Sequence, residues 1–287
     1  MPELPEVEAL RGFLADHCVG KVVADTQLVA FACLKTFEFP LTALHGLEIE
    51  RTARRGKFVG LEIGGLWLAF HLARAGWLVW GDEVPAVPAR PGRGPLAFRL
   101  RLADDSGFDL TEAGTQKRLA LHLVSRLADV PGIATLGPEP LDEAFTPEVF
   151  GAILDRAGRS QLKGVLRDQR RIAGIGNAYS DEILHAAKLS PFKPTNGLDD
   201  AERARLYTVL REELTAAVER ASGMAAKELK DGKRSAMRVH GRTGQACPVC
   251  GDTIAEVSFA DSSLQYCPTC QTGGKPLADR RLSRLLK

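Results

Sequence analysis

The sequence contains no apolar run long enough to span a membrane, and its N-terminus lacks the charged and apolar regions of a secretory signal peptide. These two absences favour a cytoplasmic protein, associated with the nucleoid if the source is bacterial. Cysteine is also scarce, with six residues in 287. Because the cytoplasm is reducing, we do not expect disulfide bonds among them.

Net charge is nearly absent as well. The chain has 38 Lys and Arg against 36 Asp and Glu, which leaves +2. The charge is unevenly distributed, because residues 227–287 hold eleven basic and six acidic side chains, a local excess of +5. Such a basic end predicts a polyanionic partner, although a charge run can also be a solvated face.

Four of the six cysteines form two Cys-x-x-Cys pairs, sixteen residues apart: Cys247, Cys250, Cys267 and Cys270. Two such pairs on a hairpin fit one tetrahedral zinc ion held by four thiolates. Because all four ligands would come from the protein, we expect this zinc to be structural. Cys18 and Cys33 have no comparable spacing, and we expect them to be core thiols.

The length of the chain predicts more than one domain. Residues 21–124 contain short apolar runs between Gly, Pro and Asp clusters, which is typical of a β-sandwich or barrel. Tight turns are expected at Gly64-Gly65 and at residues 105–107. We place the domain boundaries at residues 1–130, 131–225 and 226–287.

The middle region is predicted to be helical. Thr146, followed by a proline and an acidic residue, is a typical helix start. Asp199 with Glu202 three positions later forms a second capping signal. The Pro- and Gly-rich residues 131–147 therefore separate the strands from the helices.

The first residues, Met1-Pro2-Glu3-Leu4-Pro5-Glu6, carry a candidate nucleophile. If the initiator methionine is removed, Pro2 presents a free secondary amine, which can attack an electrophilic sugar carbon and form an iminium. Glu3 supplies a carboxyl group that can protonate the departing ring oxygen. Pro5 and the acidic residue after it predict the first turn of a helix. The alternative is an ordinary frayed terminus.

Three further segments leave alternatives open. Arg54-Arg55-Gly56-Lys57 is expected to open a strand, either as a phosphate-binding edge or as an edge strand guarded by charge. The loop from His71 to Trp77 carries Arg74, which either enters a base stack or faces water. Gly174-Ile175-Gly176-Asn177 is either a phosphate cradle at a helix start or a plain turn, and the cations around it favour phosphate.

Five segments occur in an order that resembles the formamidopyrimidine-DNA glycosylase and endonuclease VIII family of base-excision repair enzymes, over nearly the whole chain. These segments are residues 2–8, Lys57 after Arg54-Arg55-Gly56, residues 136–141 (Leu-Gly-Pro-Glu-Pro-Leu), Gly174-Ile175-Gly176-Asn177 and the four-cysteine hairpin. The resemblance implies an α+β multidomain protein. Its parts would be an N-terminal antiparallel β-sandwich, a helix-two-turn-helix domain and a zinc-finger β-hairpin, with DNA in the cleft between them.

The resemblance also implies roles for single residues. Pro2 would be the Schiff-base nucleophile, Glu3 the general acid and Lys57 a phosphate and elimination residue, while Glu6 would lie near the extruded base. The candidate DNA-binding residues are Arg54, Arg55, His71, Arg74, Lys163, Gly176, Asn177 and Tyr179. The expected cofactor is one structural zinc ion. The expected partner is damaged double-stranded DNA, or bubble or single-stranded DNA, bound by a monomer.

Departures from the family pattern bear on the choice of substrate. Arg74 stands where a methionine is common, and residues 112–117 replace a loop that fills the gap left by the flipped nucleotide, so we expect an altered wedge. The stretch from Leu229 to Val239 is short, which predicts that the loop that caps 8-oxoguanine is missing. Ser262 stands where the family usually has a phosphate-binding arginine in the finger. Three later arginines either restore this contact or form a solvated helix face: Arg280, Arg281 and Arg284.

Two functions are compatible with these observations. The favoured one is a bifunctional DNA glycosylase and AP lyase, which flips a damaged base, excises it through Pro2 and then nicks the strand by elimination. The alternative is a non-catalytic protein that binds damaged DNA on the same fold. The intact pair of Pro2 and Glu3 favours the enzyme, because a binding protein has little need of it.

Overall fold

The computed structural model describes residues 1–88, 94–260 and 262–278. The chain divides into two compact units, the first formed by Met1–Leu136 with Arg220–Lys230 and the second by Gly137–Glu219 with the chain from Asp231 onward. No helix in the described part of the chain combines the length and apolar character needed to cross a membrane. The arginines at positions 280, 281 and 284 lie outside the described residues.

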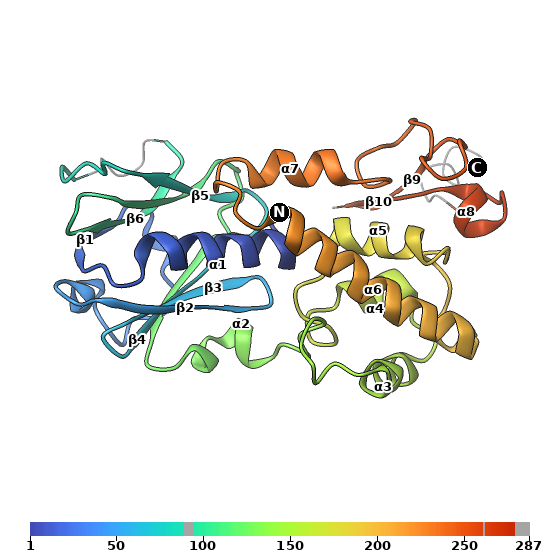
Figure 1. Cartoon of the computed structure of the whole chain (residues 1–287), viewed down its shortest axis with the longest axis horizontal. Coiled ribbons are helices and arrows are strands. Elements are labelled where there is room, and N and C mark those ends of the chain that lie inside the picture. Colours follow the sequence, from blue (N-terminus) through green and yellow to red (C-terminus); the bar gives the residue numbers. More distant parts are fainter. Residues whose placement is uncertain (89–93, 261, 279–287) are drawn as a thin grey trace. The chain divides into compact units, whose positions relative to one another are not determined.

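The first unit is an antiparallel β-sandwich, which confirms the predicted fold class. One sheet has the order β1 (Val23–Leu28), β6 (Leu96–Leu102), β7 (Gly107–Glu112) and β5 (Gly76–Gly81). The other has the order β2 (Ile49–Arg55), β3 (Phe58–Ile63), β4 (Leu66–His71) and β8 (Ala120–Val124). Helix α1 (Leu4–Cys18) runs between the sheets (Figure 1), and its apolar side chains share one core with both.

Strand β6 shows why the sheets pack in this way. Its alternating sequence buries Phe98, Leu100 and Leu102 on the core side. Arg99 lies on the other side, where it forms two hydrogen bonds of 2.8 Å with its cross-strand partner Asp109. The strand therefore contributes to the core and to cross-strand pairing at the same time.

The turns of the second sheet confirm one prediction and correct another. Gly64 and Gly65 have φ of +54° and +77° and join β3 to β4 in a two-residue hairpin, as predicted. The expectation that Arg54-Arg55-Gly56-Lys57 opens a strand is wrong. Arg54 and Arg55 end β2, and Gly56 with Lys57 forms the turn to β3, because Gly56 adopts a φ of +55° that permits a tight reversal.

The second unit is mainly helical. Its elements are α3 (Pro147–Ala157), α4 (Leu162–Arg167), α5 (Asn177–Ala186), most of α6 (Asp200–Ala221), β9 (Ala255–Ser258), β10 (Ser263–Tyr266) and α8 (Pro268–Thr272). The Thr146 side chain accepts a hydrogen bond from Val149 N at the start of α3. Asp199 and Glu202 cap α6 reciprocally at 2.8 and 3.1 Å. Both predicted helix starts are therefore confirmed.

The hairpin of β9 and β10 packs against α5 together with α8 (Figure 1). The turn between β9 and β10 is closed by Phe259 N, which donates to Ser262 O at 2.7 Å.

In the first unit, α2 (Pro131–Ala134) follows the last strand. Residues 220–230 return to the sandwich, where Trp77 Nε1 donates to Ala226 O at 3.2 Å. The end of this segment and the residues after it form α7 (Leu229–Ala236) rather than a long loop.

The two isolated cysteines are core thiols, as predicted. Cys18 and Cys33 are both buried in the sandwich core. Burial raises the pKa of Cys18 to about 12 and that of Cys33 to about 11. Both side chains therefore stay protonated and pack as small apolar groups.

Candidate active site and metal centre

The N-terminus is built into the start of α1. Glu3 is the N-cap residue and forms a capping box with Glu6, in which Glu3 N donates to Glu6 Oε2 at 2.8 Å and the Glu3 side chain accepts from Glu6 N. Pro2, Glu3 and Glu6 are all buried. The terminus is not frayed, because Pro2 adjoins a capped helix, but the alternative that its prolines merely start this helix stays open. The proposed roles of Pro2, Glu3 and Glu6 stay predictions.

Arg54 links α1 to the turn that carries Lys57. Arg54 Nε donates to Glu8 Oε2 at 2.8 Å, and Nη1 donates to Gly56 O at 3.1 Å. Lys57 follows Gly56 and is only 8% exposed. The contacts of Arg54 therefore favour a role in positioning the turn. The DNA-binding roles of Arg54 and of its neighbour Arg55, at the end of β2, stay predictions.

His71 organises the turn between β4 and β5. Its Nδ1 accepts a hydrogen bond from Ala73 N at 3.2 Å, and Ala73 itself has a φ of +50°. Burial lowers the pKa of His71 to about 4, with the nearby Lys57 adding to the effect, so the ring is neutral at pH 7. Arg74 follows at the exposed tip of this turn. His71 thus supports Arg74, and DNA contact by either residue stays a prediction.

The loop after β7 packs against the Arg74 turn. Ala113 N donates to Ala75 O at 3.4 Å, and a Cβ on Gly114 would lie 2.8 Å from Ala75 Cβ. Glu112 closes the loop. Its buried carboxylate accepts hydrogen bonds from Arg118 N at 2.8 Å and from Leu119 N at 3.1 Å. The two segments with altered sequence therefore form one surface. Sequence reasoning missed this closing role of Glu112.

The predicted tight turn before α5 is confirmed. Gly174 has a φ of +86°, and Gly176 is the N-cap residue of α5. Gln169, which sequence reasoning missed, spans the turn, since its Nε2 donates to Ile175 O at 2.6 Å and its Oε1 accepts from Gly174 N at 3.0 Å. A Cβ on Gly137 would lie 2.5 Å from the Arg171 backbone, so only glycine fits where the domain boundary meets this turn. Phosphate binding by Gly176 stays a prediction.

Lys163 lies beneath the same turn. Its side chain is 5% exposed, and Nζ donates to Asn177 O at 3.0 Å, to Ser180 Oγ at 2.9 Å and to the carboxylate of Asp181. An ammonium group has three donors, and these contacts use three. Its contacts favour a structural role at the start of α5, and the prediction that Lys163 binds DNA remains untested.

Asn177 and Tyr179 connect α5 to the C-terminal part of the second unit. Asn177 Nδ2 donates to Ser263 O in β10 at 2.7 Å. Tyr179 is buried, and Lys233 Nζ lies 4.7 Å from the centroid of its ring. Their DNA contacts stay predictions. Any phosphate contact by Asn177 would come from a side chain already anchored to the hairpin.

The four cysteines of the two pairs converge at the base of the hairpin. Cys247 Sγ lies 3.9 Å from Cys270 Sγ, and Cys250 Sγ lies 3.3 Å from Cys267 Sγ. Four sulfurs around one tetrahedral zinc would be separated by about 3.8 Å, since the Zn–S distance is about 2.3 Å. The donor set therefore fits a structural zinc, which would stabilise the folded hairpin when bound.

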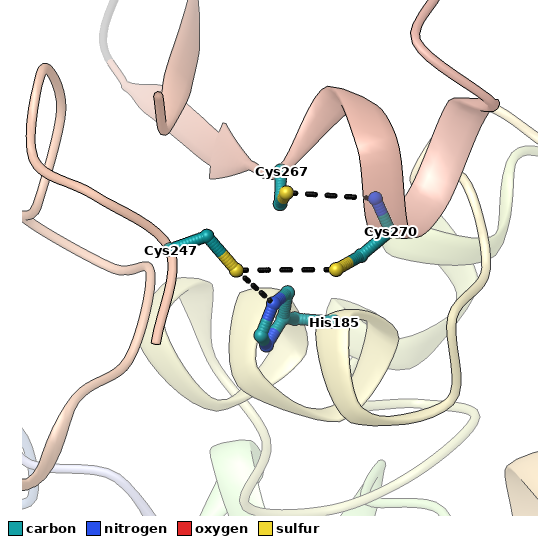
Figure 2. Close-up of side chains that lie close together, drawn as sticks. All are labelled: His185, Cys247, Cys267 and Cys270. Atoms are coloured by element: carbon teal, nitrogen blue, oxygen red, sulfur yellow. Dashed lines mark hydrogen bonds between the residues drawn. The ribbon is translucent and has the colours of Figure 1, made fainter. Parts of the chain in front are cut away.

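A histidine from α5 joins this cluster. His185 Nε2 lies 3.3 Å from Cys247 Sγ (Figure 2). The donor atoms of His185, Cys247, Cys267 and Cys270 all lie within 4.8 Å of one another. Sequence reasoning missed His185 because it is 62 residues from Cys247 and belongs to no metal-binding spacing.

Three family models match the chain. "Formamidopyrimidine-DNA glycosylase N-terminal domain" matches residues 1–119, "Formamidopyrimidine-DNA glycosylase H2TH domain" matches residues 136–228, and "Zinc finger found in FPG and IleRS" matches residues 244–273. The last match confirms the zinc finger predicted from the cysteine spacing, with one structural zinc as its cofactor.

Similar proteins agree with these models. The formamidopyrimidine-DNA glycosylase of Symbiobacterium thermophilum is 35% identical over 98% of this chain and 93% of its own length. The crystal structure of MutM (Fpg) from Thermus thermophilus is 33% identical, with a TM-score of 0.78, over 96% of this chain and 100% of that chain. A complex between Lactococcus lactis Fpg and DNA containing an abasic site is 28% identical, with a TM-score of 0.82, over 94% of this chain and 99% of that chain.

Proposed function

Because this chain belongs to the formamidopyrimidine-DNA glycosylase family of base-excision repair enzymes, we propose that it is a bifunctional DNA glycosylase and AP lyase. Its substrate is damaged double-stranded DNA, bound by a monomer, and it also accepts bubble or single-stranded DNA. The reaction requires removal of Met1, which exposes the Pro2 nitrogen as a secondary amine.

The proposed chemistry has two stages. The Pro2 nitrogen bonds to the sugar carbon that carries the base, and the base departs with the proton that the amine loses. Glu3 protonates the ring oxygen as the sugar opens to an iminium. The iminium then acidifies the adjacent carbon. Loss of a proton there expels the neighbouring phosphate and nicks the strand, with Lys57 binding phosphate and assisting this elimination.

The observation that carries this proposal is the placement of Pro2 directly before a capped, buried helix start. The capping box between Glu3 and Glu6 fixes the backbone beside the nucleophile, so the carboxyl group of Glu3 has a defined position relative to Pro2. Such preorganisation is what covalent and acid catalysis need. A protein that only bound DNA would have little need of the pair formed by Pro2 and Glu3.

Borohydride trapping tests the proposal. The full chain is incubated with DNA containing an abasic site in the presence of borohydride, which reduces an iminium to a stable amine. A covalent complex through Pro2, identified by mass spectrometry of the N-terminal peptide, is expected. Tight binding of the same DNA without any trapped complex would instead establish the non-catalytic alternative.

The altered surface of Arg74 and the loop after β7 supports a preference for lesions that are already unstacked. Extrusion of a stacked base costs a few kcal/mol, and a charged side chain does not replace an apolar wedge. We therefore expect this enzyme to nick abasic duplex DNA at least tenfold faster than it excises 8-oxoguanine opposite cytosine. Single-turnover rates of both reactions, measured at one salt concentration, check this. Equal rates would contradict it.

Arg74→Ala provides the matching variant. If Arg74 enters the opened stack, this change should weaken binding to abasic DNA several-fold more than binding to undamaged DNA. Arg126→Ala is a suitable control, because Arg126 is an exposed arginine of the same unit that is paired with Asp129. An equal loss of affinity for damaged and undamaged DNA would show that Arg74 makes only a non-specific phosphate contact.

A further inference from the structure

Helix α5 contacts the C-terminal segment at three levels along its length. At its start, Asn177 binds β10. In its middle, the Glu182 carboxylate, 2% exposed, accepts from three successive backbone N–H groups at 2.8, 3.0 and 2.8 Å: those of Arg238, Val239 and His240. Near its end, His185 meets Cys247. The finger is therefore built onto one face of this helix.

The contact between His185 and Cys247 allows two interpretations. The imidazole is either a zinc ligand through Nε2, or it donates an Nε2–H hydrogen bond to a thiolate that is itself the ligand. The two interpretations differ in where the ring carries its proton. A neutral imidazole that binds metal through Nε2 carries the proton on Nδ1.

The surroundings of Nδ1 decide between them. His185 Nδ1 is buried, and it has no hydrogen-bond partner among the described residues. A metal-binding histidine almost always donates its other N–H to a carboxylate, carbonyl or water, and a buried N–H without an acceptor costs about 1–3 kcal/mol. With the proton on Nε2, the Nδ1 lone pair is the group left without a partner, but the N–H group has an acceptor. This tautomer directs its proton at Cys247 Sγ, 3.3 Å away.

The four cysteines are enough to fill a tetrahedral zinc site without the histidine, although Cys250 is not in the group of donor atoms that lie within 4.8 Å of one another. Cys250 Sγ is 3.3 Å from Cys267 Sγ, and Cys247 Sγ is 3.9 Å from Cys270 Sγ. Four thiolates around Zn²⁺ leave a net charge of about −2 on the centre. A hydrogen-bond donor directed at one sulfur stabilises that charge, and charge-assisted bonds of this kind are the stronger class.

We propose that His185 is not a zinc ligand but a positioning residue, which donates from Nε2 to the Cys247 thiolate and so couples the zinc centre to α5. Metal retention and the anchoring of the finger on the helix then depend on the same hydrogen bond. This inference concerns metal binding and stands whether or not the proposed Pro2 chemistry is correct.

Two variants of the full chain separate the hydrogen bond from packing. His185→Phe keeps a ring but removes the donor, and His185→Gln keeps an N–H donor. We expect His185→Phe to release zinc to a chelator about 10- to 100-fold faster than the parent, as for other residues that support metal ligands. His185→Gln should recover part of this loss. His240→Gln is the matched control, because His240 lies in the same region but contacts Asp181 at 2.8 Å.

Cobalt substitution tests the ligand assignment directly. The visible absorption bands of bound Co²⁺ depend on how many sulfurs surround it, so they should be nearly unchanged in His185→Phe and clearly shifted in Cys250→Ser. The opposite pattern, with shifted bands in His185→Phe and unshifted bands in Cys250→Ser, would show that His185 is the fourth ligand and overturn the proposal. Zinc release from His185→Phe at the parental rate would overturn it as well.

Discussion

Glu3→Gln is expected to slow excision of a damaged base by about a hundredfold to ten-thousandfold, the usual contribution of a positioned general acid. It should slow nicking of a preformed abasic site much less, because that reaction starts with an opened or readily opened sugar. Glutamine has nearly the same shape and can still accept from Glu6 N, so the start of α1 should be retained. Single-turnover excision and nicking assays on the same preparation measure the two effects.

The control for this variant is Asp16→Asn, which removes a carboxylate from an exposed position of the same helix. Pro2→Gly supplies the companion test, because it replaces the secondary amine with a primary one. It should weaken borohydride trapping and leave DNA affinity largely intact. If Glu3→Gln and Pro2→Gly both excise bases as the parent does, the mechanism proposed for this terminus is wrong.

The second large effect is expected from Cys267→Ser. The parent should contain about one zinc ion per molecule, and the variant should lose it together with DNA binding, because a structural zinc contributes about 10–16 kcal/mol of apparent binding free energy to folding. Cys267 is fully buried and joins the thiols to the N-terminus of α8, so its loss affects the whole finger. Metal analysis and DNA titration at one salt concentration provide the measurement.

Cys33→Ser is the matched control for Cys267→Ser. Cys33 is a buried thiol of the sandwich, and its Sγ donates to Ala97 O rather than facing other cysteines. This variant should keep both zinc and DNA affinity. A carefully prepared parent without zinc, or a Cys267→Ser variant that retains it, would contradict the metal assignment.

The sequence by itself determined the features that depend on neighbouring residues. Two glycines in succession predicted the turn at Gly64-Gly65. Thr146 followed by a proline and an acidic residue predicted the start of α3, and capping residues three positions apart predicted the start of α6. The spacing of the cysteines predicted the zinc finger. The order of short motifs, compared with a known family, predicted the sandwich and the helical domain. Each of these predictions used only a few neighbouring residues or the order of motifs in a known family.

Only the tertiary structure showed which buried polar side chains form ion pairs and hydrogen bonds with one another or with distant backbone. Lys163 resembled a phosphate-binding cation in sequence, yet it is buried against Asp181, eighteen residues away. Glu182 and His185 carried no signal in sequence, because the backbone that Glu182 caps and the thiol that His185 meets lie about sixty residues later. A buried ion pair or hydrogen bond forms between two polar groups that folding buries next to each other. Contacts between segments that are distant in sequence determine which groups these are, and the neighbouring residues in the chain do not.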